Sequence, residues 1–235
     1  MARARPPHRL ADILAAAMRV FARHGLERAK MSDVAAEARV SQGTLYNYVE
    51  SKEALFRLLL DRGLGAELPR TEAFPVASPS ADELARRMED AVAANFALPR
   101  LAAALRRRRA ADARAELAGV IDELFRRTFE TRDAADVLER SAQDVPELAA
   151  AFYGRVRRNI VDRLAGLLTR RIAAGQYRRT DPAVTARMIL ETVTLFARHI
   201  YRDPAPPGPE PRIDVEVARR TVVEVLVGGI VSRRR

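Results

Sequence analysis

An all-α fold is predicted by three observations on the 235-residue sequence. Apolar residues recur at intervals of three and four along most of the chain, the spacing that gathers them on one face of a helix. Prolines fall between these segments and so mark where helices begin and end. Only one segment, near the C-terminus, has the β-branched composition of a strand, and no second candidate strand is present to pair with it.

Composition excludes several classes of protein and site. Hydrophobic residues make up 48% of the chain, so the sequence can bury a core and is not a disordered polycation. Cysteine is absent and the histidines His8, His24 and His199 are far apart, so we expect no disulfide, thiol nucleophile or metal site. No apolar run approaches the roughly 20 residues of a membrane span, and no signal peptide is evident. The expected location is the cytoplasm, without membrane association.

The chain carries a formal net charge of +10, with 39 arginines and only two lysines. A basic chain suggests nucleic acid or another polyanion as its partner. The charge is spread along the sequence, however, since residues 1–62 hold 11 basic and 7 acidic residues and residues 63–235 hold 30 and 24. Coding bias toward alanine and arginine explains such enrichment equally well. Both lysines, Lys30 and Lys52, lie in the N-terminal segment.

The first 65 residues are predicted to form four helices, three of them short. Glycine readily ends a helix, and Ser is a preferred N-cap residue. The expected elements are a helix whose apolar face runs from Leu10 to Phe21 and which ends at Gly25, a short pattern at 34–38, a helix over 41–48, and a helix capped by Ser51.

Longer helices are predicted beyond a proline-containing linker at 69–79. Asp181 followed by Pro182 is a strong helix start, because the acid caps the first turn and proline fits the first helical position. The helix over 181–202 is apolar almost all round and so needs two partners, one of which can be a second subunit. The β-branched segment at 214–231 is predicted to be a buried helix. The full set of ranges is 80–98, 100–109, 111–131, 146–174, 181–202 and 214–231.

Residues 30–56 carry the pattern of a helix-turn-helix. A short helix, a tight turn and a second short helix beginning at Ser41 would leave polar side chains facing outward, the arrangement that enters a DNA major groove. Gly43 lets the backbone approach the duplex, and Thr44 can contact a phosphate or a thymine methyl group. Gln42 and Asn47 are the better candidates for reading bases, since amides pair with adenine edges.

This segment resembles the N-terminal signature of the TetR-type transcriptional regulators. The matching residues are Phe21 to Gly25, Asp33 to Ala35, Val40 to Tyr48, and Ser51 to Leu55. The resemblance implies an N-terminal three-helix helix-turn-helix domain over 1–65 that binds DNA. It further implies a larger C-terminal helical bundle domain over 66–235 that binds a ligand and forms the homodimer. For Lys52 it implies a contact with a backbone phosphate.

Three positions depart from the family pattern. Lys30 stands where Thr or Ser usually caps the second helix, so that either Ser32 takes over the cap or Lys30 contacts a phosphate. Arg39 replaces the usual turn glycine, which implies either a strained left-handed residue or a different turn. Val49 replaces the usual Phe and removes packing volume behind the recognition helix.

Two sets of candidate site residues follow. The expected DNA-binding residues are polar or small residues of the helix-turn-helix together with two tyrosines: Lys30, Ser41, Gln42, Gly43, Thr44, Tyr46, Asn47, Tyr48 and Lys52. The expected effector-binding residues are large or polar residues on apolar helix faces, each of which can equally belong to the core or to a dimer interface: Asn95, Phe96, Phe125, Phe129, Tyr153, Met188, Glu191, Thr192 and His199. The run Arg106 to Arg109 is either a second nucleic-acid patch or a solvated helix end.

The residues and the resemblance together predict a ligand-responsive transcriptional repressor. It would bind a palindromic operator in double-stranded DNA as a homodimer and be released by a small hydrophobic effector. An activator or a ligand-independent regulator of the same family is an alternative, as is a basic helical adaptor for an acidic protein. No cofactor is expected. No catalytic constellation or phosphate-binding glycine loop is present, so we predict that the chain is not an enzyme.

Overall fold

The computed structural model describes residues 7–63, 67, 69–70, 73–95, 97–199 and 213–232. Within these residues every regular element is a helix, and the β pairings are two isolated bridges, which confirms the predicted all-α fold. None of the helices in this part of the chain is long and apolar enough to cross a membrane. The chain divides into two compact units, Met1–Asn95 with Asp133–Val156, and Phe96–Arg132 with Arg157–Arg235.

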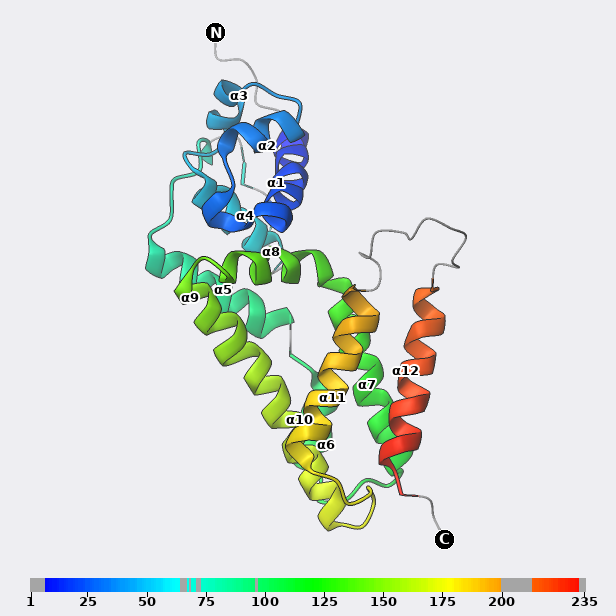
Figure 1. Cartoon of the computed structure of the whole chain (residues 1–235). Coiled ribbons are helices and arrows are strands. Elements are labelled where there is room, and N and C mark those ends of the chain that lie inside the picture. The colour runs from blue at the N-terminus through cyan, green and yellow to red at the C-terminus, as the bar shows by residue number, and fades with distance from the viewer. Residues whose placement is uncertain are drawn as a thin grey trace. The chain divides into compact units, whose positions relative to one another are not determined.

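The N-terminal helices of the first unit follow the predicted order (Figure 1). The apolar face of the first helix is fully buried, and its Phe21 ring meets Phe56 edge-on with the centroids 5.6 Å apart. Gly25, with φ of 74°, breaks the helical geometry where the sequence predicts an end, although helical turns resume beyond it. The helices are α1 (Pro7–Arg28), α2 (Met31–Glu37), α3 (Gln42–Tyr46) and α4 (Lys52–Gly63).

The rest of the first unit is built from α5 (Ala81–Asn95), α8 (Arg132–Ala142), α9 (Pro146–Ala149) and the π-helical segment η2 (Ala150–Arg157). Helix α8 lies outside the predicted helical ranges. Four of its six buried residues are apolar and lie on one face of the helix, while Asp136 and Ser141 are polar, so the segment is amphipathic but carries few large apolar side chains. The predicted helix-turn-helix domain over 1–65 lies within this unit, and whether residue 65 is a functional domain boundary stays a prediction.

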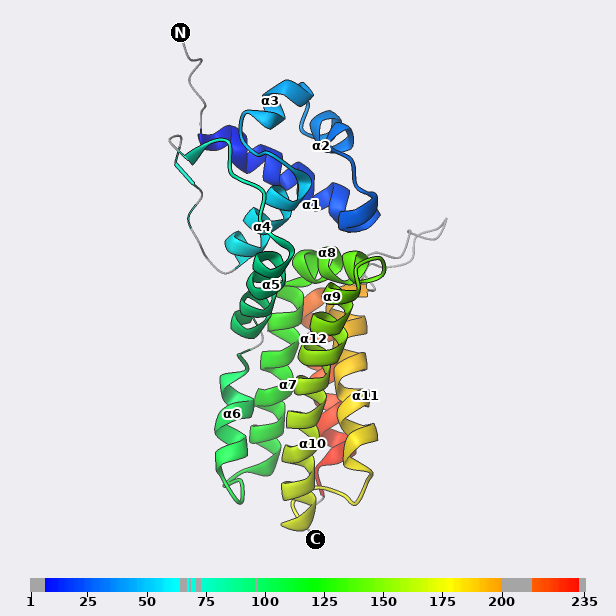
Figure 2. The ribbon, with the colours of Figure 1, turned by 90° about the vertical axis from the view of Figure 1, so that its left-hand side faces the viewer.

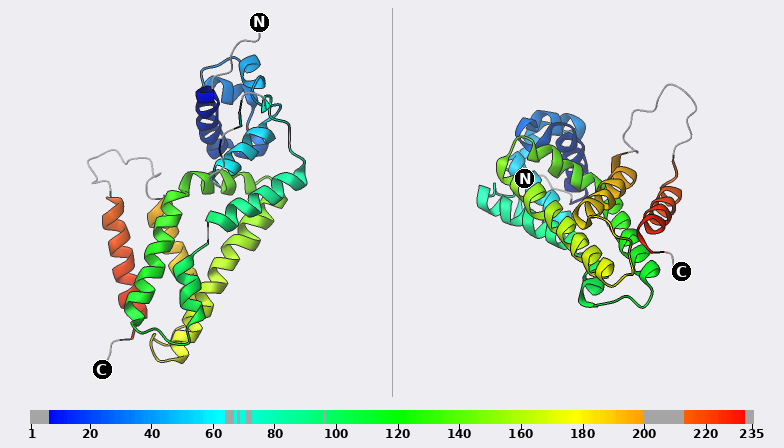
Figure 3. Two further views of the ribbon diagram at one scale, coloured as in Figure 1. Left: turned by 180° about the vertical axis from the view of Figure 1, so that it is seen from behind. Right: turned by 60° about the horizontal axis from the view of Figure 1, so that its bottom comes forward.

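The second unit is a bundle of longer helices (Figure 2). Helix α7 packs against α6, α11 and α12, and α10 packs against α6 and α11. Figure 3 shows α12 beside α7 from behind. The β-branched segment is helical as predicted. The elements are α6 (Pro99–Arg106), α7 (Ala113–Glu130), α10 (Arg158–Ala173), α11 (Pro182–Thr194), η3 (Leu195–His199) and α12 (Val215–Ile230).

Aspartate caps begin three of these helices. The Asp181 carboxylate accepts a hydrogen bond from the Val184 N–H at 2.8 Å, which confirms the predicted start of α11. Asp112 and Asp214 cap α7 and α12 in the same way, each accepting two backbone N–H bonds. A carboxylate at this position also stabilises the positive end of the helix dipole.

Helix α6 ends at Arg106, earlier than the sequence predicts, because a buried arginine binds the backbone carbonyls of the residues that follow. Arg171 of α10 has no exposed side-chain surface, and it donates both to the Glu116 carboxylate, at 2.6 and 2.9 Å, and to the carbonyls of Ala104, Arg107 and Arg108. Five N–H groups thereby meet acceptors, so the buried charge is fully satisfied. This cluster ties the α6–α7 connection to α10.

Candidate nucleic-acid interface

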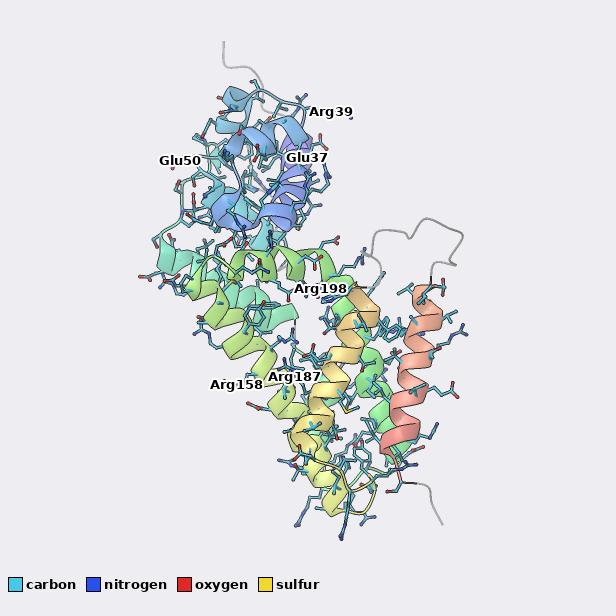
Figure 4. All side chains as sticks on the ribbon, in the orientation of Figure 1. Glu37, Arg39, Glu50, Arg158, Arg187 and Arg198 are labelled. Atoms are coloured by element: carbon cyan, nitrogen blue, oxygen red, sulfur yellow. The ribbon has the colours of Figure 1, made fainter. Side chains whose placement is uncertain are left out.

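The turn between α2 and α3 is closed by a left-handed residue. Arg39 has φ of 55°, the Arg39 N–H bonds to the Ala36 carbonyl at 3.1 Å, and the Val40 N–H bonds to the Ala35 carbonyl at 2.9 Å. This is the pattern of a helix end that glycine usually supplies. Of the two possibilities left by the sequence, the structure has the strained left-handed residue. Figure 4 labels Arg39 at this turn.

Helix α3 begins with a side-chain cap from Ser41. The Ser41 hydroxyl accepts a hydrogen bond from the Thr44 N–H at 3.1 Å and lies 2.8 Å from the Thr44 hydroxyl. Both hydroxyls are therefore engaged in holding the first turn of the helix. Exposed Gly43 has only the Ser41 Oγ, at 4.0 Å, near the position that a Cβ would occupy, so the backbone there is open to a large ligand.

The exposed residues of α3 and its end are Gln42, Gly43, Tyr46 and Asn47. Tyr46 exposes 46% of its surface, which leaves a large part of this side chain open to a partner. Leu45, by contrast, is completely buried and anchors the helix from behind. The structure thus presents a small surface of one amide, one phenol, a second amide and open backbone, which is the donor and acceptor chemistry that reads base edges and phosphates.

Tyr48 differs from the other predicted contact residues. It is only 3% exposed, and its ring packs edge-on against Phe74 with the centroids 5.0 Å apart. Tyr48 therefore packs beneath α3 in this structure, and its contact with DNA stays a prediction.

Lys30 is the N-terminal flanking residue of α2 and makes no capping bond through its side chain. Ser32 does not take over the cap, because its hydroxyl lies 3.4 Å from the Asp33 carboxylate instead. Of the two possibilities raised by the sequence, only the exposed lysine contacting a phosphate stays consistent with the structure, and that contact is a prediction.

Lys52 has an unexpected partner within the protein. Its ammonium group donates to the backbone carbonyl of Glu27 at 2.7 Å and so joins the start of α4 to the end of α1. An ammonium has three donors, so the bond leaves capacity for a phosphate. The same helix is capped by Ser51, whose hydroxyl accepts from the Ala54 N–H at 3.2 Å, as the sequence predicts.

Charged contacts fix α2 and the end of α1. Arg19 and Arg23 of α1 both pair with Glu37 of α2, and their hydrogen bonds lower the pKa of the Glu37 carboxyl from its ordinary 4.5. At the end of α1 the Leu26 N–H donates to the Ser141 hydroxyl of α8 at 3.0 Å. Within the first unit, ion pairs thus bind α2 to α1, and a hydrogen bond joins the end of α1 to α8.

The predicted effector-binding residues that the structure describes lie in different surroundings, and their role stays a prediction. Tyr153 belongs to the first unit and is 42% exposed, whereas Phe125 in the second unit is 1% exposed. The Glu191 carboxylate is bound by Arg157 and Arg187. Phe129 is half-buried beneath the Arg132 guanidinium, which lies 4.2 Å from its ring centroid, while Met188 and His199 are exposed and Thr192 is half-buried. The Asn95 side chain and Phe96 lie outside the described residues.

A cavity of about 920 Å³ lies where the α6–α7 connection meets the residues after α10 and the end of α12. It contains none of the predicted effector-binding residues, although its lining includes Arg109 from the run Arg106 to Arg109. Its lining is mostly polar or small: Arg109, Ala111, Asp112, Ala113, Arg114, Gly175, Gln176, Gly228, Val231 and Ser232. In the described part of the chain no group of three or more His, Cys, Asp or Glu residues is placed to hold a metal ion.

Comparison with protein families gives two matches. Residues 13–59 match the family described as bacterial regulatory proteins, tetR family. Residues 130–224 match the family described as AefR-like transcriptional repressor, C-terminal domain. The first match runs from within α1 to within α4 and so includes all the predicted DNA-binding residues, and the second falls on later helices.

Individual relatives agree with these families. An uncharacterized HTH-type transcriptional regulator, YfiR, of Bacillus subtilis (strain 168) is 41% identical over 64 residues, which are 27% of this chain and 31% of that protein. The chain therefore spans less than a third of the length of this curated relative.

Two solved structures share the fold over nearly the whole chain. The structure of AibR in complex with isovaleryl coenzyme A and operator DNA has a TM-score of 0.56 and 21% identity, over 94% of this chain and 99% of that one. The ketosteroid transcriptional regulator KstR2 of Mycobacterium tuberculosis has a TM-score of 0.57 and 18% identity, over 96% of both chains.

Proposed function

We propose that this chain, which belongs to the TetR family of bacterial regulatory proteins, represses transcription by binding a palindromic operator as a homodimer and leaves it when a small hydrophobic effector binds. The observation that carries the proposal is the exposed surface of α3. It combines Gln42, Tyr46 and Asn47 with open backbone at Gly43, on a helix whose opposite side is anchored by fully buried Leu45.

The homodimer is supported by large apolar side chains that are exposed on the surface of the second unit. On α11 and η3, Val184, Met188 and Leu195 are 59%, 58% and 46% exposed, and their spacing of four and seven places them along one face. On α12, Val217 and Val225 are 47% and 65% exposed. A second copy of the chain is the occupant we propose, since large apolar surfaces of this kind mark interaction sites.

A homodimer gives the two recognition helices a fixed separation. Helices that enter successive major grooves lie about 34–36 Å apart, and two-fold symmetry in the protein then requires a palindromic site. Polar contacts from Gln42 and Asn47 would read bases, while Lys30, Ser41, Thr44, Tyr46 and Lys52 would contact phosphates or fix the register. Gly43 would admit the backbone close to the duplex.

The effector is proposed to be a small hydrophobic or amphipathic molecule bound in the helical region. Support comes from the fold shared with AibR, whose structure holds isovaleryl coenzyme A and operator DNA, and from aromatic residues on α7. Effector and operator would weaken each other by the same factor, because the coupling free energy between two sites is reciprocal.

A gel-shift titration tests the DNA-binding proposal. The probe is the DNA upstream of the chain's own gene, with a scrambled duplex of equal length as the competitor. We expect Tyr46→Ala and Gln42→Ala to weaken binding, and Tyr153→Ala, an exposed tyrosine away from α3, to leave it unchanged. If both α3 variants bind the probe as the unmodified protein does, the recognition-helix assignment is wrong.

Transcription from the same DNA in vitro separates repression from activation, since a repressor lowers the amount of transcript. Isovaleryl coenzyme A is a suitable first probe for the effector and isovalerate its control. An effector that works as proposed raises the protein concentration needed for the gel shift.

A further inference from the structure

The segment Ala73–Ser80, which we name the strap, does not behave as the simple linker that the sequence predicts over 69–79. It returns to the turn between α3 and α4, where Val76 pairs with Val49 in a parallel bridge. The Val76 N–H donates to the Tyr48 carbonyl at 2.8 Å, and the Glu50 N–H donates to the Val76 carbonyl at 3.0 Å. In Figure 2 the strap is the teal segment that leads to α5 from beside the helix-turn-helix.

Side chains strengthen this attachment. Phe74 and Val76 of the strap are 8% and 4% exposed, and Tyr48 and Val49 of the turn are 3% and 0% exposed. The Phe74 ring meets the Tyr48 ring edge-on at an interplanar angle of 61°. The strap therefore packs apolar side chains against the turn, and beside them the Ser78 N–H donates to the Glu50 carboxylate at 3.0 Å. Figure 4 labels Glu50.

The turn that the strap holds follows directly on the recognition helix. Helix α3 has five residues, and a helix this short has little stability of its own. Its direction is set by what holds its two ends. Ser41 caps the beginning of the helix. Beyond its far end, the strap hydrogen-bonds to the backbone of Tyr48 and packs against the side chains of Tyr48 and Val49.

The other end of the strap is fixed as firmly. The Ser80 hydroxyl accepts from the Glu83 N–H at 3.2 Å, and the Glu83 carboxylate accepts from the Ser80 N–H at 3.1 Å. This reciprocal pair is a capping box that begins α5, and the Ser80 N–H bond lowers the pKa of Glu83. The strap thus leads into α5 at one end, and it is bound through Val76 and Phe74 to the residues that follow α3.

We propose that Phe74 and Val76 are positioning residues for operator recognition, which hold the α3–α4 turn so that α3 presents Gln42, Tyr46 and Asn47 in one fixed direction. The residues act through Tyr48 and Val49 and do not touch DNA themselves. This inference rests on the proposed DNA-binding function. It predicts that weakening the strap lowers specific affinity for the operator while leaving non-specific attraction to DNA, which depends on net positive charge, unchanged.

The main variant is Phe74→Ala, compared with the conservative Phe74→Leu. Loss of the ring contact and of its buried area is expected to weaken operator binding by about tenfold or more, and Phe74→Leu to recover most of it. Affinity for a scrambled duplex of equal length should change by less than about twofold. Ser78→Ala is the matched control within the strap, because Ser78 bonds through its backbone N–H and is exposed.

A stability control separates positioning from simple destabilisation. Met88→Ala removes a fully buried side chain on α5, outside the strap. We expect it to lower the melting temperature without a matching loss of operator affinity. If Phe74→Ala and Met88→Ala lose affinity in the same proportion to their loss in melting temperature, the strap is only a structural element and the proposal is overturned.

A disulfide across the bridge tests the proposal in the opposite direction. The chain has no cysteine, so Val49→Cys with Val76→Cys introduces one possible pair, and the reduced protein is the control for the oxidised one. Oxidation should slow hydrogen exchange of the amides at 45–50 and preserve or increase operator affinity. Oxidised protein with lower operator affinity than the reduced protein would contradict the strap's role.

Hydrogen exchange also distinguishes the two proposals from each other. If the unmodified chain binds no specific DNA, the proposed function fails, but exchange still reports on the strap. Phe74→Ala should accelerate exchange at 45–50 more than Met88→Ala does. Equal exchange in these two variants overturns the strap inference whether or not the chain binds DNA.

Discussion

Helix α3 and helices α11 and α12 all expose side chains that a partner can cover, yet the two surfaces are opposite in chemistry. α3 exposes amides, a phenol and open backbone, and it buries Leu45. Helices α11 and α12 expose valines and Met188. Exposed polar groups form hydrogen bonds with water, so leaving them without a protein partner costs little free energy. Exposed apolar surface has no such compensation, and its burial against a partner is favourable. The first surface suits a partner that comes and goes, such as DNA, and the second suits a lasting subunit contact.

Arginine also serves two different purposes in this protein. Around α1 and α2, Arg19 and Arg23 are more than half exposed and pair with Glu37 at the surface. In the second unit Arg171 is completely buried and shapes the backbone after α6. Net charge therefore says little about where this protein binds, because arginine forms exposed surface pairs at some positions and a buried scaffold at another.

The largest effect is expected from breaking the buried pair in the second unit. Glu116→Ala leaves Arg171 buried without its carboxylate, which costs about 3–5 kcal/mol of the free energy of unfolding. Urea denaturation at a fixed protomer concentration measures the loss. Glu130→Ala, which removes a partner of Arg127 that is 58% exposed, should cost less than about 1 kcal/mol. Equal losses in both variants would remove the distinction between buried scaffold and surface pair.

A charge on the apolar face of the second unit should weaken the homodimer. Met188→Asp and Val225→Asp each place a carboxylate on this exposed surface, and the dimer dissociation constant is expected to rise by a factor of about 30, or about 2 kcal/mol. Sedimentation velocity over a range of protein concentrations measures this. Thr169→Asp adds the same charge at an exposed position on α10 and serves as the control. A protein that is already monomeric at micromolar concentration contradicts the dimer.

A smaller effect is expected on α3. Gln42→Ala should cost about 1–3 kcal/mol of operator binding and relax the preference for one base pair. Lys30→Ala should instead weaken specific and non-specific DNA alike and reduce the slope of log affinity against log salt by about one phosphate contact. Fluorescence anisotropy titrations at several salt concentrations measure both. The roles are misassigned if Gln42→Ala changes the salt slope and Lys30→Ala changes the base preference.

The smallest effect concerns Glu37. Hydrogen bonds from Arg19 and Arg23 lower its pKa, so the pairs stabilise the fold above its ordinary value of 4.5 and this contribution is lost as the pH falls through the lowered pKa. Melting temperatures between about pH 3 and 7 should therefore fall less steeply with acid in Glu37→Gln than in the unmodified protein. Glu27→Gln, at an exposed position on α1, should leave the acid limb unchanged. An unaltered limb in Glu37→Gln would show that these surface pairs contribute nothing.

Local signals were sufficient for the helix starts. Ser51 and Asp181 cap helices as predicted, since an N-cap depends on a side chain and amides two or three residues away. Signals that depend on distant partners were misleading. The burial of Tyr48 comes from Phe74, which is 26 residues away in sequence, and the early end of α6 comes from Arg171. Helix α8 was not predicted, although four of its six buried residues are apolar.

The sequence by itself determined that the chain is helical, where most helices begin, and which short segment carries the helix-turn-helix pattern. These properties depend on apolar spacing and on caps, both of which act within a few residues. Only the tertiary structure decided that Lys52 is tied to the Glu27 carbonyl, that Tyr48 faces inward, and that the predicted linker returns as the strap. Each of these depends on contacts between segments 25 or more residues apart, and such contacts leave no periodic trace in a single sequence.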